Sequence, residues 1–493
     1  MITIHGLACA SCHGSLTTES ERLLRCTSCQ AQYPLIDGIP SFISPAAEES
    51  LGSSCELSVV IPALNESDNL SLLLPSLRHA LDSLDMPYEV IVVDGGSADA
   101  TREVAAANGA QVIVQIERGY GGALRAGFKR ARGRHVITLD ADGSHDPSLL
   151  SALWSARSSA EVVIASRYVA GGATEMAPFR YVLSRILNIA FRRGLSLPVA
   201  DLSSGFRLYT RAALRELTLT ANDFDVLEEI LIRVLASGYR VAEVPFRYRA
   251  RVGGRSHAQL FKFALSYLRT FGSMWKLRNS IASADYDHRA YNSLIPLQRS
   301  WQRRRFRIIT GQTSGAETVL DVGCGSSRIL AFDPGVVGLD VQLHKLRYAR
   351  QFGNPLVHGS VFALPFADAS FDCLICSEVI EHIPAEEKVF DELFRVLKPG
   401  GRLILGTPDY DRWRWRVLEW IYGRVSPGGY ADEHITHYGR SNLESYLRGR
   451  GVAIERTQYV QGCEMILTLR KPDSTKLEQL RVEKPVTSAL RSS

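Results

Sequence analysis

The stretch HVITLDADGSHDP, residues 135–147, joins an apolar run to three carboxylates. The run HVITL predicts a buried strand, and Asp140, Asp142 and Asp146 follow directly after it. Ligands of open α/β sheets gather at the carboxyl ends of the strands. The D-x-D spacing lets Asp140 and Asp142 face the same side and hold a hard cation through oxygen ligands. The stretch therefore predicts an α/β sheet with a cation site at one edge, while a D-x-D pair taken alone also suits a turn or a helix cap.

Further strand patterns around this stretch extend the sheet. They alternate with helical segments, as in a doubly wound, mostly parallel sheet, and they are LSVVI (57–61), YEVIVV (88–93), QVIVQI (111–116) and EVVIAS (161–166). Carboxylates at such strand ends suit ribose hydroxyls and base edges. The residues that follow the first two runs are Pro62, Asn65, Glu66 and Asp94. Together with the D-x-D pair, they predict a nucleotide site.

A second α/β pattern begins with ETVLDVGCGSS (317–327) and ends near residue 470. Its first strand leads into Asp321-x-Gly323-x-Gly325, and Asp340 ends the next strand. The glycines let a ligand approach the backbone, and an acid about twenty residues further on suits ribose hydroxyls. The full G-x-G-x-x-G pattern is missing, which argues against a dinucleotide. The sequence therefore predicts a second, different nucleotide-type site.

Four of the nine cysteines lie in the first 29 residues, as Cys9-x-x-Cys12 and Cys26-x-x-Cys29. Two such pairs are typical of a tetrahedral zinc site, which lets a segment without a core of its own fold. The pair Cys373 and Cys376 lies within a strand pattern, where small core residues are the favoured interpretation. The first segment is therefore predicted to be a zinc ribbon.

A chain of 493 residues is too long for one hydrophobic core. The predicted order is a zinc ribbon (1–45), a first α/β domain (56–280), a linker (281–316), a second α/β domain (317–470) and a disordered tail (471–493). The formal net charge of +5 is small for this length, so no nucleic-acid partner is expected. The chain has no long uncharged apolar run and no apolar signal-peptide core, so we expect a cytoplasmic protein.

The segment 258–276 predicts an amphipathic helix with basic residues opposite its apolar stripe. Such a stripe commonly packs against its own domain, but a basic amphipathic helix can also lie on a membrane. A peripheral contact with the inner face of the membrane therefore stays open. The stripe consists of Leu260, Ala264, Tyr267, Leu268, Phe271 and Trp275.

The first α/β domain, from about Leu57 to Lys276, resembles the family-2 inverting glycosyltransferases of the GT-A type, and in particular their dolichol-phosphate mannosyltransferase-like branch. The motifs that carry the resemblance are VVIPALNES, VVDGGSADAT, RGYGGALRAGFKRARG, DADGSHDP, ASRYVAGG, DLSSGFRLYTR and VPFRYRARVGGRSH. It implies a hexosyltransferase with a nucleotide-sugar donor bound by Pro62, Asn65, Glu66 and Asp94. It also implies Mg²⁺ or Mn²⁺ on Asp140 and Asp142, and phosphate contacts from Arg167, Ser204, Arg207 and Arg251. The family usually carries a lysine where this chain has His257.

The acceptor implied by this resemblance is a polyprenyl phosphate. A phosphate monoester, with a second pKa of about 6, needs no general base at neutral pH. A hydroxyl acceptor on a glycan or metabolite is the alternative, and it would need a carboxylate such as Asp225, Glu228 or Glu229. These three acids also suit an ordinary helix surface. The general base therefore distinguishes the two acceptors.

The second α/β domain, roughly residues 300–470, resembles class I methyltransferases that bind S-adenosylmethionine. Its marks are TVLDVGCGSS, ALPFADASFDCLIC, SEVIEHI, LFRVLKPGGRLILGTP and DEHITHY. The resemblance implies that Asp321, Gly323 and Gly325 hold the methionine part and that Asp340 binds the ribose. Ser360 stands where many relatives have an acid near the adenine. Candidates for substrate positioning or proton removal are His382, His434 and His437, although lone histidines are commonly structural.

The N-terminal segment resembles the small zinc-ribbon protein that activates several class I methyltransferases in trans. Here the ribbon is part of the same chain. We expect it either to dock on a catalytic domain, such as the methyltransferase, or to serve only as a structural clip. The whole sequence predicts a bifunctional enzyme that transfers a sugar by inverting displacement and methylates a related product. The alternative is a second α/β half that acts as a non-catalytic binding module.

Overall fold

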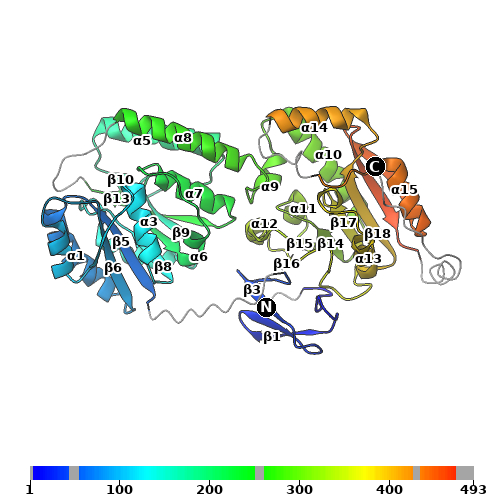
Figure 1. Cartoon of the computed structure of the whole chain (residues 1–493), viewed down its shortest axis with the longest axis horizontal. Helices are drawn as coiled ribbons and strands as arrows, with labels where there is room; N and C mark the ends of the chain where they lie inside the picture. Colours follow the sequence, from blue (N-terminus) through cyan, green and yellow to red (C-terminus); the bar gives the residue numbers. More distant parts are fainter. Residues whose placement is uncertain (1–3, 44–54, 250–259, 426–433, 473–493) are drawn as a thin grey trace. The chain divides into compact units, whose positions relative to one another are not determined.

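The structure is a computed structural model that describes residues 4–43, 55–249, 260–425 and 434–472. Among the residues singled out by the sequence, Arg251 and His257 lie outside these ranges, and so does most of the predicted tail. The chain divides into two compact units, Met1–Glu49 with Asn279–Ser493, and Ser50–Arg278 (Figure 1). The N-terminal ribbon therefore belongs to the same unit as the second α/β domain.

The unit Ser50–Arg278 is built around a seven-stranded mixed sheet of order β12-β9-β11-β8-β5-β6-β7. Neighbouring strands are parallel except at β11, which runs antiparallel to β8 and β9. The strands are β5 (Leu57–Ala63), β6 (Tyr88–Asp94), β7 (Gln111–Val114), β8 (His135–Thr138), β9 (Val162–Ser166), β11 (Arg207–Thr210) and β12 (Val241–Pro245). Two short strands, β10 (Ala173–Thr174) and β13 (Arg247–Tyr248), pair separately. The predicted α/β fold is confirmed, with an antiparallel strand added.

Helices cover both faces of this sheet, because successive side chains of a strand point to opposite sides. On β5, Val59 and Ile61 join the core formed with α1 and α4, whereas Val60 joins the core formed with α3. The helices of the unit are α1 (Ser67–Asp82), α2 (Thr101–Ala107), α3 (Tyr120–Arg130), α4 (Leu150–Ala156), α5 (Pro178–Gly194), α6 (Arg211–Arg215), α7 (Val226–Ala236) and α8 (Leu260–Arg278).

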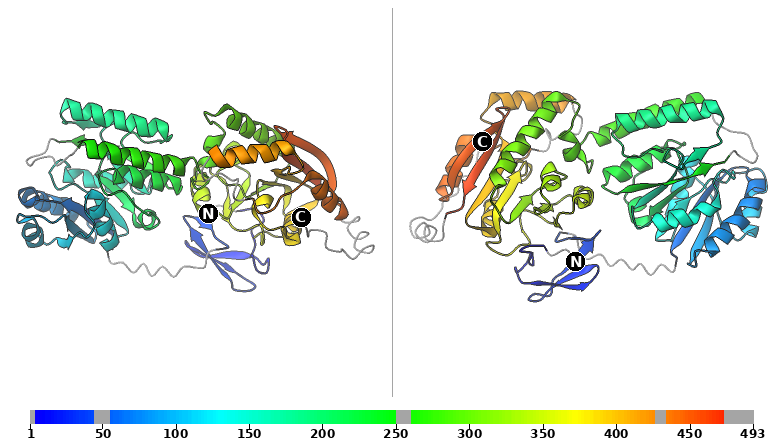
Figure 2. Two further views of the ribbon diagram at one scale, coloured as in Figure 1. Left: turned by 45° about the horizontal axis from the view of Figure 1, so that its top comes forward. Right: turned by 180° about the vertical axis from the view of Figure 1, so that it is seen from behind.

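Helices α5 and α8 lie side by side, and their inner faces meet through aromatic contacts (Figure 2). Phe191 of α5 meets Tyr267 and Phe271 of α8, with ring centroids 6.3 Å and 5.1 Å apart. Part of the predicted apolar stripe therefore packs within its own domain. Leu268 and Trp275 of the same stripe are exposed. Among the described residues, no helix is long and apolar enough to cross a membrane.

The second unit contains another seven-stranded sheet, of order β16-β15-β14-β17-β18-β20-β19. The first five strands are mutually parallel, and β20 runs antiparallel to β18 and β19. The strands are β14 (Val319–Val322), β15 (Val337–Asp340), β16 (Leu356–His358), β17 (Phe371–Ser377), β18 (Leu397–Pro408), β19 (Ala453–Val460) and β20 (Glu464–Arg470). Cys373 and Cys376 of β17 are buried core residues, as expected.

Helices also cover both faces of this second sheet. Helices α13 and α15 contribute to one core, and α10, α11 and α12 contribute to the other. The helices are α9 (Tyr286–Ala290), α10 (Pro296–Thr313), α11 (Arg328–Phe332), α12 (Leu343–Ala349), α13 (Glu387–Val396), α14 (Trp413–Val425) and α15 (Arg440–Gly449).

The stretch 281–316, for which the sequence predicts a linker, forms α9 and α10 in the structure. Helix α10 buries Ile308 and Ile309 in the core beside Val319 of β14. Because α10 is rich in arginine, its sequence does not show a clear apolar face. These helices belong to the compact unit that holds the second sheet.

The N-terminal residues form a four-stranded antiparallel sheet of β1 (Leu16–Ser20), β2 (Leu23–Cys26), β3 (Gln32–Ile36) and β4 (Ile39–Pro40). The ribbon docks on the domain of the second sheet through backbone hydrogen bonds and an ion pair. The backbone amide of Ala8 donates to Pro365 O at 2.9 Å, and that of Phe42 donates to His358 O at 2.8 Å. Arg347 pairs with Asp37 at 2.6 Å. Docking on the methyltransferase-like domain, one of the two alternatives, is therefore present in the structure.

Candidate functional sites

The carboxyl ends of β5 and β6 bring the first group of predicted residues together. Asp94 ends β6 and is fully buried, and its carboxylate accepts hydrogen bonds from the backbone amides of Gly96 and Ser97, both at 3.1 Å. Asn65 follows β5 with a φ of 56°, and its side-chain oxygen accepts a bond from Ala98 N at 2.8 Å. Pro62 pairs in register with the strand that carries Asp94.

Glu66 belongs to the same edge, because its backbone amide donates to Thr101 Oγ1 at 2.9 Å. Its carboxylate accepts a bond from the side chain of Asn69 at 2.5 Å. Hydrogen bonds thus join the loop after β5 to the segment that leads from β6 into α2. These bonds fix the relative positions of the loop after β5 and the loop after β6.

The D-x-D pair follows β8 at the same edge of the sheet. Asp142 is 5% exposed and accepts bonds from Ser144 N at 3.0 Å and Ser144 Oγ at 2.5 Å. Asp140 is more accessible and accepts a bond from the Tyr120 hydroxyl at 2.9 Å. Two carboxylates with oxygen donors fit a hard divalent cation such as Mg²⁺ or Mn²⁺.

Three residues at this edge were not predicted as site residues. Tyr120 contacts Asp140, and His145 Nε2 lies 3.7 Å from Asp140 Oδ2. His145 is buried, and desolvation lowers its pKa even though Asp140 and Asp142 raise it. Gly205 passes so close that an added Cβ would lie 2.8 Å from the Tyr120 hydroxyl and 3.1 Å from Asp140 Oδ1. Tyr120 and Gly205 come from other segments of the chain, so no local pattern marks their contacts, whereas His145 lies in the same loop as Asp140 and could have been selected from the stretch DADGSHDP.

Two arginines predicted to hold phosphates have protein partners in the structure, and their phosphate role stays a prediction. Arg207 is fully buried, and its guanidinium donates to the backbone oxygens of Ser204, Leu227 and Leu202. Arg167 makes a paired contact with Asp201, at 2.7 Å from Nε and 2.6 Å from Nη2. The structure thus gives both side chains a role in holding the loop 201–207.

Ser204 is the third predicted phosphate contact in this loop, and it is buried. Its hydroxyl has no hydrogen-bond partner among the described residues. The fourth predicted contact, Arg251, lies outside the described residues.

The three candidate bases of the segment 225–229 are all buried. Glu229 accepts bonds from Thr220 and Ala221 and pairs with Arg233, so its oxygens stabilise the turn before α7. Asp225 accepts a bond from Thr270 at 2.6 Å, and burial raises its pKa. Burial raises the pKa of Glu228 to about 8. The structure does not place these acids on an open helix surface.

In the second unit, the glycine turn after β14 lies against the acid at the end of β15. The Gly325 amide donates to Asp340 Oδ2, and the Gln342 amide donates to Asp340 Oδ1, both at 2.7 Å. Gly323 and Gly325 have φ values of 72° and 53°, which other residues rarely adopt. A Cβ on Gly323 would meet Val379 Cγ2 at 2.3 Å. The turn therefore requires glycine, as a close approach of S-adenosylmethionine would.

Asp321 is the last but one residue of β14, directly before this turn. It is 4% exposed, and burial raises its pKa from 3.8 to about 8. Ser327 Oγ lies 3.4 Å from its carboxylate. A buried carboxyl of this kind is stabilised in its charged form by a positively charged ligand.

Asp287 of α9 also contacts the glycine turn, although no motif in the sequence marks it. It pairs with Lys345 Nζ at 3.0 Å and accepts a bond from Ser326 N at 3.3 Å. A Cβ on Gly325 would lie 2.6 Å from Asp287 Oδ2. The residue lies in the predicted linker, so its position became visible only with the fold.

The three candidate histidines occupy one region beyond β17 and β18. His434 contacts the Tyr410 hydroxyl at 2.7 Å and Glu419 at 2.9 Å, both through Nδ1. The ring centroids of His382 and His434 are 4.9 Å apart. His437 is exposed and stacks on Tyr410 at 4.1 Å. Ser360 stands where many methyltransferases have an acid near the adenine. In the structure it forms an isolated antiparallel β-bridge with Ala363.

The four N-terminal cysteines converge in the ribbon. Cys9 and Cys29 sulfurs are 3.5 Å apart, as are those of Cys12 and Cys26, and all four lie within 4.8 Å of one another. Tetrahedral zinc with bonds of about 2.3 Å requires sulfur separations of about 3.8 Å. Although burial raises it, hydrogen bonds with Tyr33 and backbone amides lower the pKa of Cys9 to about 6. The donor set and spacing fit Zn²⁺.

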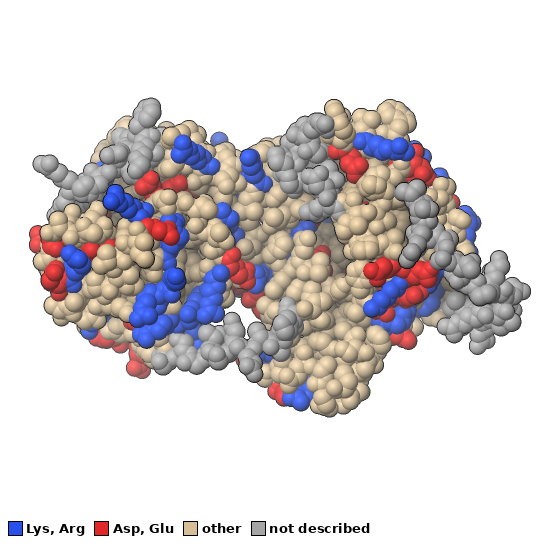
Figure 3. Space-filling view, viewed as in Figure 1, with Lys and Arg blue, Asp and Glu red and all other residues tan. Residues whose placement is uncertain are grey.

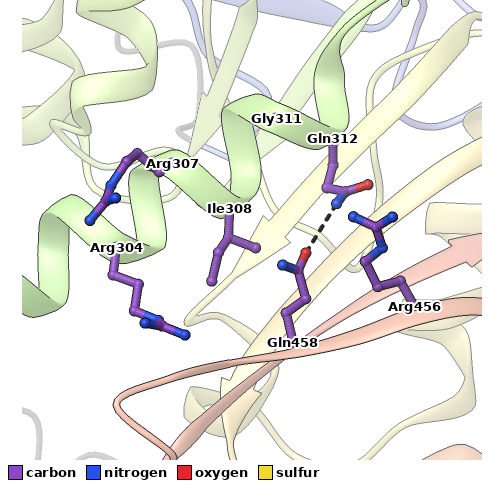
Figure 4. Close-up of a pocket in the computed structure, with 7 residues that line it drawn as sticks. All are labelled: Arg304, Arg307, Ile308, Gly311, Gln312, Arg456 and Gln458. Atoms are coloured by element: carbon purple, nitrogen blue, oxygen red, sulfur yellow. Dashed lines mark hydrogen bonds between the residues drawn. The ribbon is translucent and has the colours of Figure 1, made fainter.

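A pocket of about 290 Å³ lies away from these sites, between α10 and β19 (Figure 4). Gln312 and Gln458 meet there through a 3.0 Å hydrogen bond. No residue predicted from the sequence lines it. Elsewhere, basic and acidic side chains are interspersed on the face shown in Figure 3, in keeping with the small net charge.

Comparison with known families agrees with the two sheets. Residues 58–218 match the model of glycosyl transferase family 2, and residues 320–405 match a methyltransferase domain. The first sheet, with carboxylates at the ends of its strands, is therefore that of a glycosyltransferase domain. The second sheet, mostly parallel and with a glycine turn, is that of a methyltransferase domain. The chain belongs to glycosyltransferase family 2 and carries a methyltransferase domain in the same polypeptide.

Two relatives resemble the glycosyltransferase domain. The dolichol-phosphate mannosyltransferase of Pyrococcus furiosus is 33% identical over 237 residues, which cover 46% of this chain and 65% of that protein, less than two thirds of its length. The polyprenol monophosphomannose synthase of Mycolicibacterium smegmatis is 36% identical over 215 residues, covering 40% of this chain and 79% of that protein.

A solved structure was also matched, that of glucosyl-3-phosphoglycerate synthase from Mycobacterium tuberculosis in complex with Mn²⁺, UDP-glucose and phosphoglyceric acid. It is 24% identical, has a TM-score of 0.38, and the match covers 48% of this chain and 86% of that chain.

Proposed function

We propose that the glycosyltransferase domain transfers a sugar from a nucleotide-sugar to a polyprenyl phosphate, with inversion, and that the methyltransferase domain methylates a related product. The observation that carries the first activity is the convergence of Asp94, Asp140 and Asp142 at one sheet edge. The relatives named as mannosyltransferase and monophosphomannose synthase support the lipid acceptor.

The residues of this edge divide the work of binding the donor. Asp94 and the Asn65 loop suit the nucleoside, where carboxylate and amide groups can bind ribose and base. Asp140 and Asp142 would hold the cation. The bound cation would neutralise the negative charge that develops on the leaving diphosphate. Ser144 and Tyr120 fix these carboxylates before the donor binds. Preorganised charge of this kind lowers the barrier to transfer.

Burial of the three candidate bases favours a phosphate acceptor over a hydroxyl. Asp225, Glu228 and Glu229 are each no more than 4% exposed. A hydroxyl acceptor needs a base within hydrogen-bond reach, whereas a phosphate is already a nucleophile at neutral pH. The buried acids therefore support the polyprenyl phosphate.

The outer face of α5 supports a lipid acceptor from a separate direction. Its exposed apolar side chains are Phe179, Val182, Leu183, Ile186 and Ile189. Exposed arginines, Arg180, Arg192 and Arg193, lie on the same helix. Apolar side chains flanked by basic ones are typical of helices that lie on a membrane surface. We propose that α5, beside α8, gives the domain a peripheral contact with the membrane that holds its acceptor.

The test incubates the full chain with Mg²⁺ or Mn²⁺, labelled nucleotide-sugars and a polyprenyl phosphate, and counts label in the organic phase. Asp142→Asn should reduce that label at least about 100-fold, because it weakens the cation site. Asp146→Asn is the matched control, since Asp146 lies in the same loop but caps Ser148 and pairs with Arg249. Equal loss in both variants, or none in Asp142→Asn, would refute the site.

Donor hydrolysis without lipid-borne label would instead favour the hydroxyl acceptor. In that case Asp225→Asn and Glu228→Gln are the variants that should stop transfer.

For the methyltransferase domain, the fit of the glycine turn supports S-adenosylmethionine. The positive φ values of Gly323 and Gly325 bring the turn against Asp340, which suits the ribose of the cofactor, and bound cofactor would supply a methyl group on a positively charged sulfur. His434 is proposed to position the acceptor. Calorimetry with S-adenosylmethionine tests this directly, and a full chain that binds none would favour the alternative of a non-catalytic module.

A further inference from the structure

Three potential metal ligands meet beyond the carboxyl ends of β17 and β18. They are Glu381 and His382, which follow β17, and His434, which lies more than fifty residues further along the chain. One ligand atom from each lies within 4.8 Å of the other two. The backbone draws them together, because the amides of Ile435 and Thr436 donate to Glu381 O at 2.8 Å and 3.0 Å.

His434 has the hydrogen-bond support that is usual for a metal-binding histidine. Its Nδ1 lies 2.9 Å from Glu419 and 2.7 Å from the Tyr410 hydroxyl, and its side chain is 3% exposed. When Nδ1 carries the proton for Glu419, the lone pair is on Nε2. Histidine ligands of metals commonly give their second ring N–H to a carboxylate in this way.

Glu381 adds a second, independent observation. Its side chain is fully buried, and one oxygen accepts a bond from Thr407 at 3.2 Å. The other oxygen, Oε1, has no hydrogen-bond partner among the described residues. A buried carboxylate oxygen without a donor is costly unless a cation or proton satisfies it.

We propose that Glu381, His382 and His434 form a binding site for a divalent cation in the methyltransferase domain. Two imidazoles and one carboxylate suit borderline ions such as Zn²⁺, Co²⁺ or Mn²⁺ better than Mg²⁺ or Ca²⁺. The site is distinct from the cysteine cluster and from the D-x-D pair of the other unit.

The position of the cluster gives the cation a use in the proposed methylation. Val379, two residues before Glu381, lies against Gly323 of the glycine turn. The site therefore borders the region proposed for S-adenosylmethionine, on the side of the candidate acceptor residues. A cation with three protein ligands keeps positions for water or substrate oxygen. This use rests on the proposed methyltransferase function, whereas cation binding itself does not.

The test counts Co²⁺ bound to the full chain after dialysis, with the cysteine site first filled with Zn²⁺. The double variant His382→Gln/His434→Gln should lose one equivalent of Co²⁺ per chain relative to the wild type. His437→Gln is the matched control, because His437 stacks on Tyr410 outside the cluster and should keep that equivalent. The D-x-D pair is present in all three proteins, so its contribution cancels.

Equal Co²⁺ content in the wild type and the double variant overturns the proposal, and shows that the cluster is only a hydrogen-bond network. Binding of S-adenosylmethionine, measured in parallel by calorimetry, reports separately on the methyltransferase function. A chain that binds Co²⁺ here but no S-adenosylmethionine keeps the site and refutes the methylation proposal.

A second measurement does not depend on the folding of the double variant. Glu419→Gln should weaken Co²⁺ binding about 10- to 100-fold, as loss of an outer hydrogen-bond partner of a ligand does. In the wild type, Co²⁺ should also quench the fluorescence of Trp415, whose ring stacks with His434 at 5.9 Å. Trp415→Phe should remove that part of the quenching. Unchanged affinity in Glu419→Gln, with no such quenching, contradicts the site.

Discussion

The carboxyl edges of the two seven-stranded sheets hold their acids in different ways. In the glycosyltransferase domain, Asp94 and Asp142 accept hydrogen bonds from backbone amides and from Ser144. In the methyltransferase domain, Asp340 likewise accepts bonds from two backbone amides, but burial raises the pKa of Asp321 to about 8. The acids of the first edge have their donors in place, whereas Asp321 of the second edge is stabilised in its charged form only when a positive ligand arrives. Removing a donor and changing the pH should therefore affect the two edges differently.

The largest expected effect concerns Arg207, which supports the first edge from within the core. Arg207→Met should lower the free energy of unfolding of the glycosyltransferase unit by more than about 3 kcal/mol, because three backbone oxygens lose a charged donor. Denaturant unfolding followed by tryptophan fluorescence measures this. A variant that folds with unchanged stability but loses transfer would contradict this structural role and support the phosphate role that the sequence predicts.

The second edge should respond to pH through Asp321. Below about pH 8 its carboxyl is protonated in the folded protein, so binding of a positively charged cofactor must first release that proton. The affinity for S-adenosylmethionine should rise about tenfold per pH unit from pH 6 and level off above pH 8. Calorimetry across this range measures it, and Asp321→Asn should flatten the curve.

The raised pKa of Asp321 affects the stability of the ligand-free protein in the opposite direction: a higher pH favours cofactor binding but lowers the free energy of unfolding. The unfolded chain releases this proton near the ordinary value of 3.8, whereas the folded chain keeps it to about 8. The folded state binds more protons between these values, so stability falls as the pH rises through them. Thermal melts that show the methyltransferase unit becoming more stable from pH 5 to 8, and equally so in Asp321→Asn, would contradict the burial of a protonated Asp321.

Two glycines allow a matched comparison of the edges. Gly325→Ala puts a Cβ 2.6 Å from Asp287 at a φ of 53°, and should weaken S-adenosylmethionine binding about tenfold while destabilising its unit by about 1–3 kcal/mol. Gly205→Ala crowds Tyr120 and Asp140 and should weaken donor and Mn²⁺ binding instead. Calorimetry with both ligands should show each variant impaired for one ligand only. Cross-effects would mean that the two edges are not independent.

The strands and the first ligands of each edge could be predicted because their signals are local. HVITL followed by Asp140 and Asp142, and TVLDV followed by Gly323, each join a strand to its site within a few residues. The spacing of the four N-terminal cysteines predicts the ribbon in the same way. Where a strand leads directly into a loop, the sequence was sufficient to predict the strand and the side chains that lie at its end, while the roles of those side chains stay predictions.

The contacts that could not be predicted join distant parts of the chain. Arg167 bonds Asp201, 34 residues further on, and Arg207 bonds the carbonyl of Leu227, 20 residues further on. A short motif therefore cannot show that protein groups accept the hydrogen bonds of these two guanidinium groups. Asp287 could not be selected because α9 is only five residues long and α10 is rich in arginine, so neither helix shows a clear apolar pattern. Their positions depend on packing, which the spacing of residues along the chain does not record.

The smallest expected effect concerns the ribbon and decides between a docked support and a simple clip. Ser41 Oγ lies 2.8 Å from His358 Nδ1, and His358 Nε2 lies 3.1 Å from Val341 O, next to Asp340. Ser41→Ala should cost about 1 kcal/mol of unfolding free energy and weaken S-adenosylmethionine binding a few-fold, because the support beneath Asp340 loosens. Ser11→Ala is the control, since the hydroxyl of Ser11 contacts Tyr33 within the ribbon. If calorimetry gives the same cofactor affinity for both variants and the wild type, the ribbon is a clip that holds itself together without supporting the cofactor site.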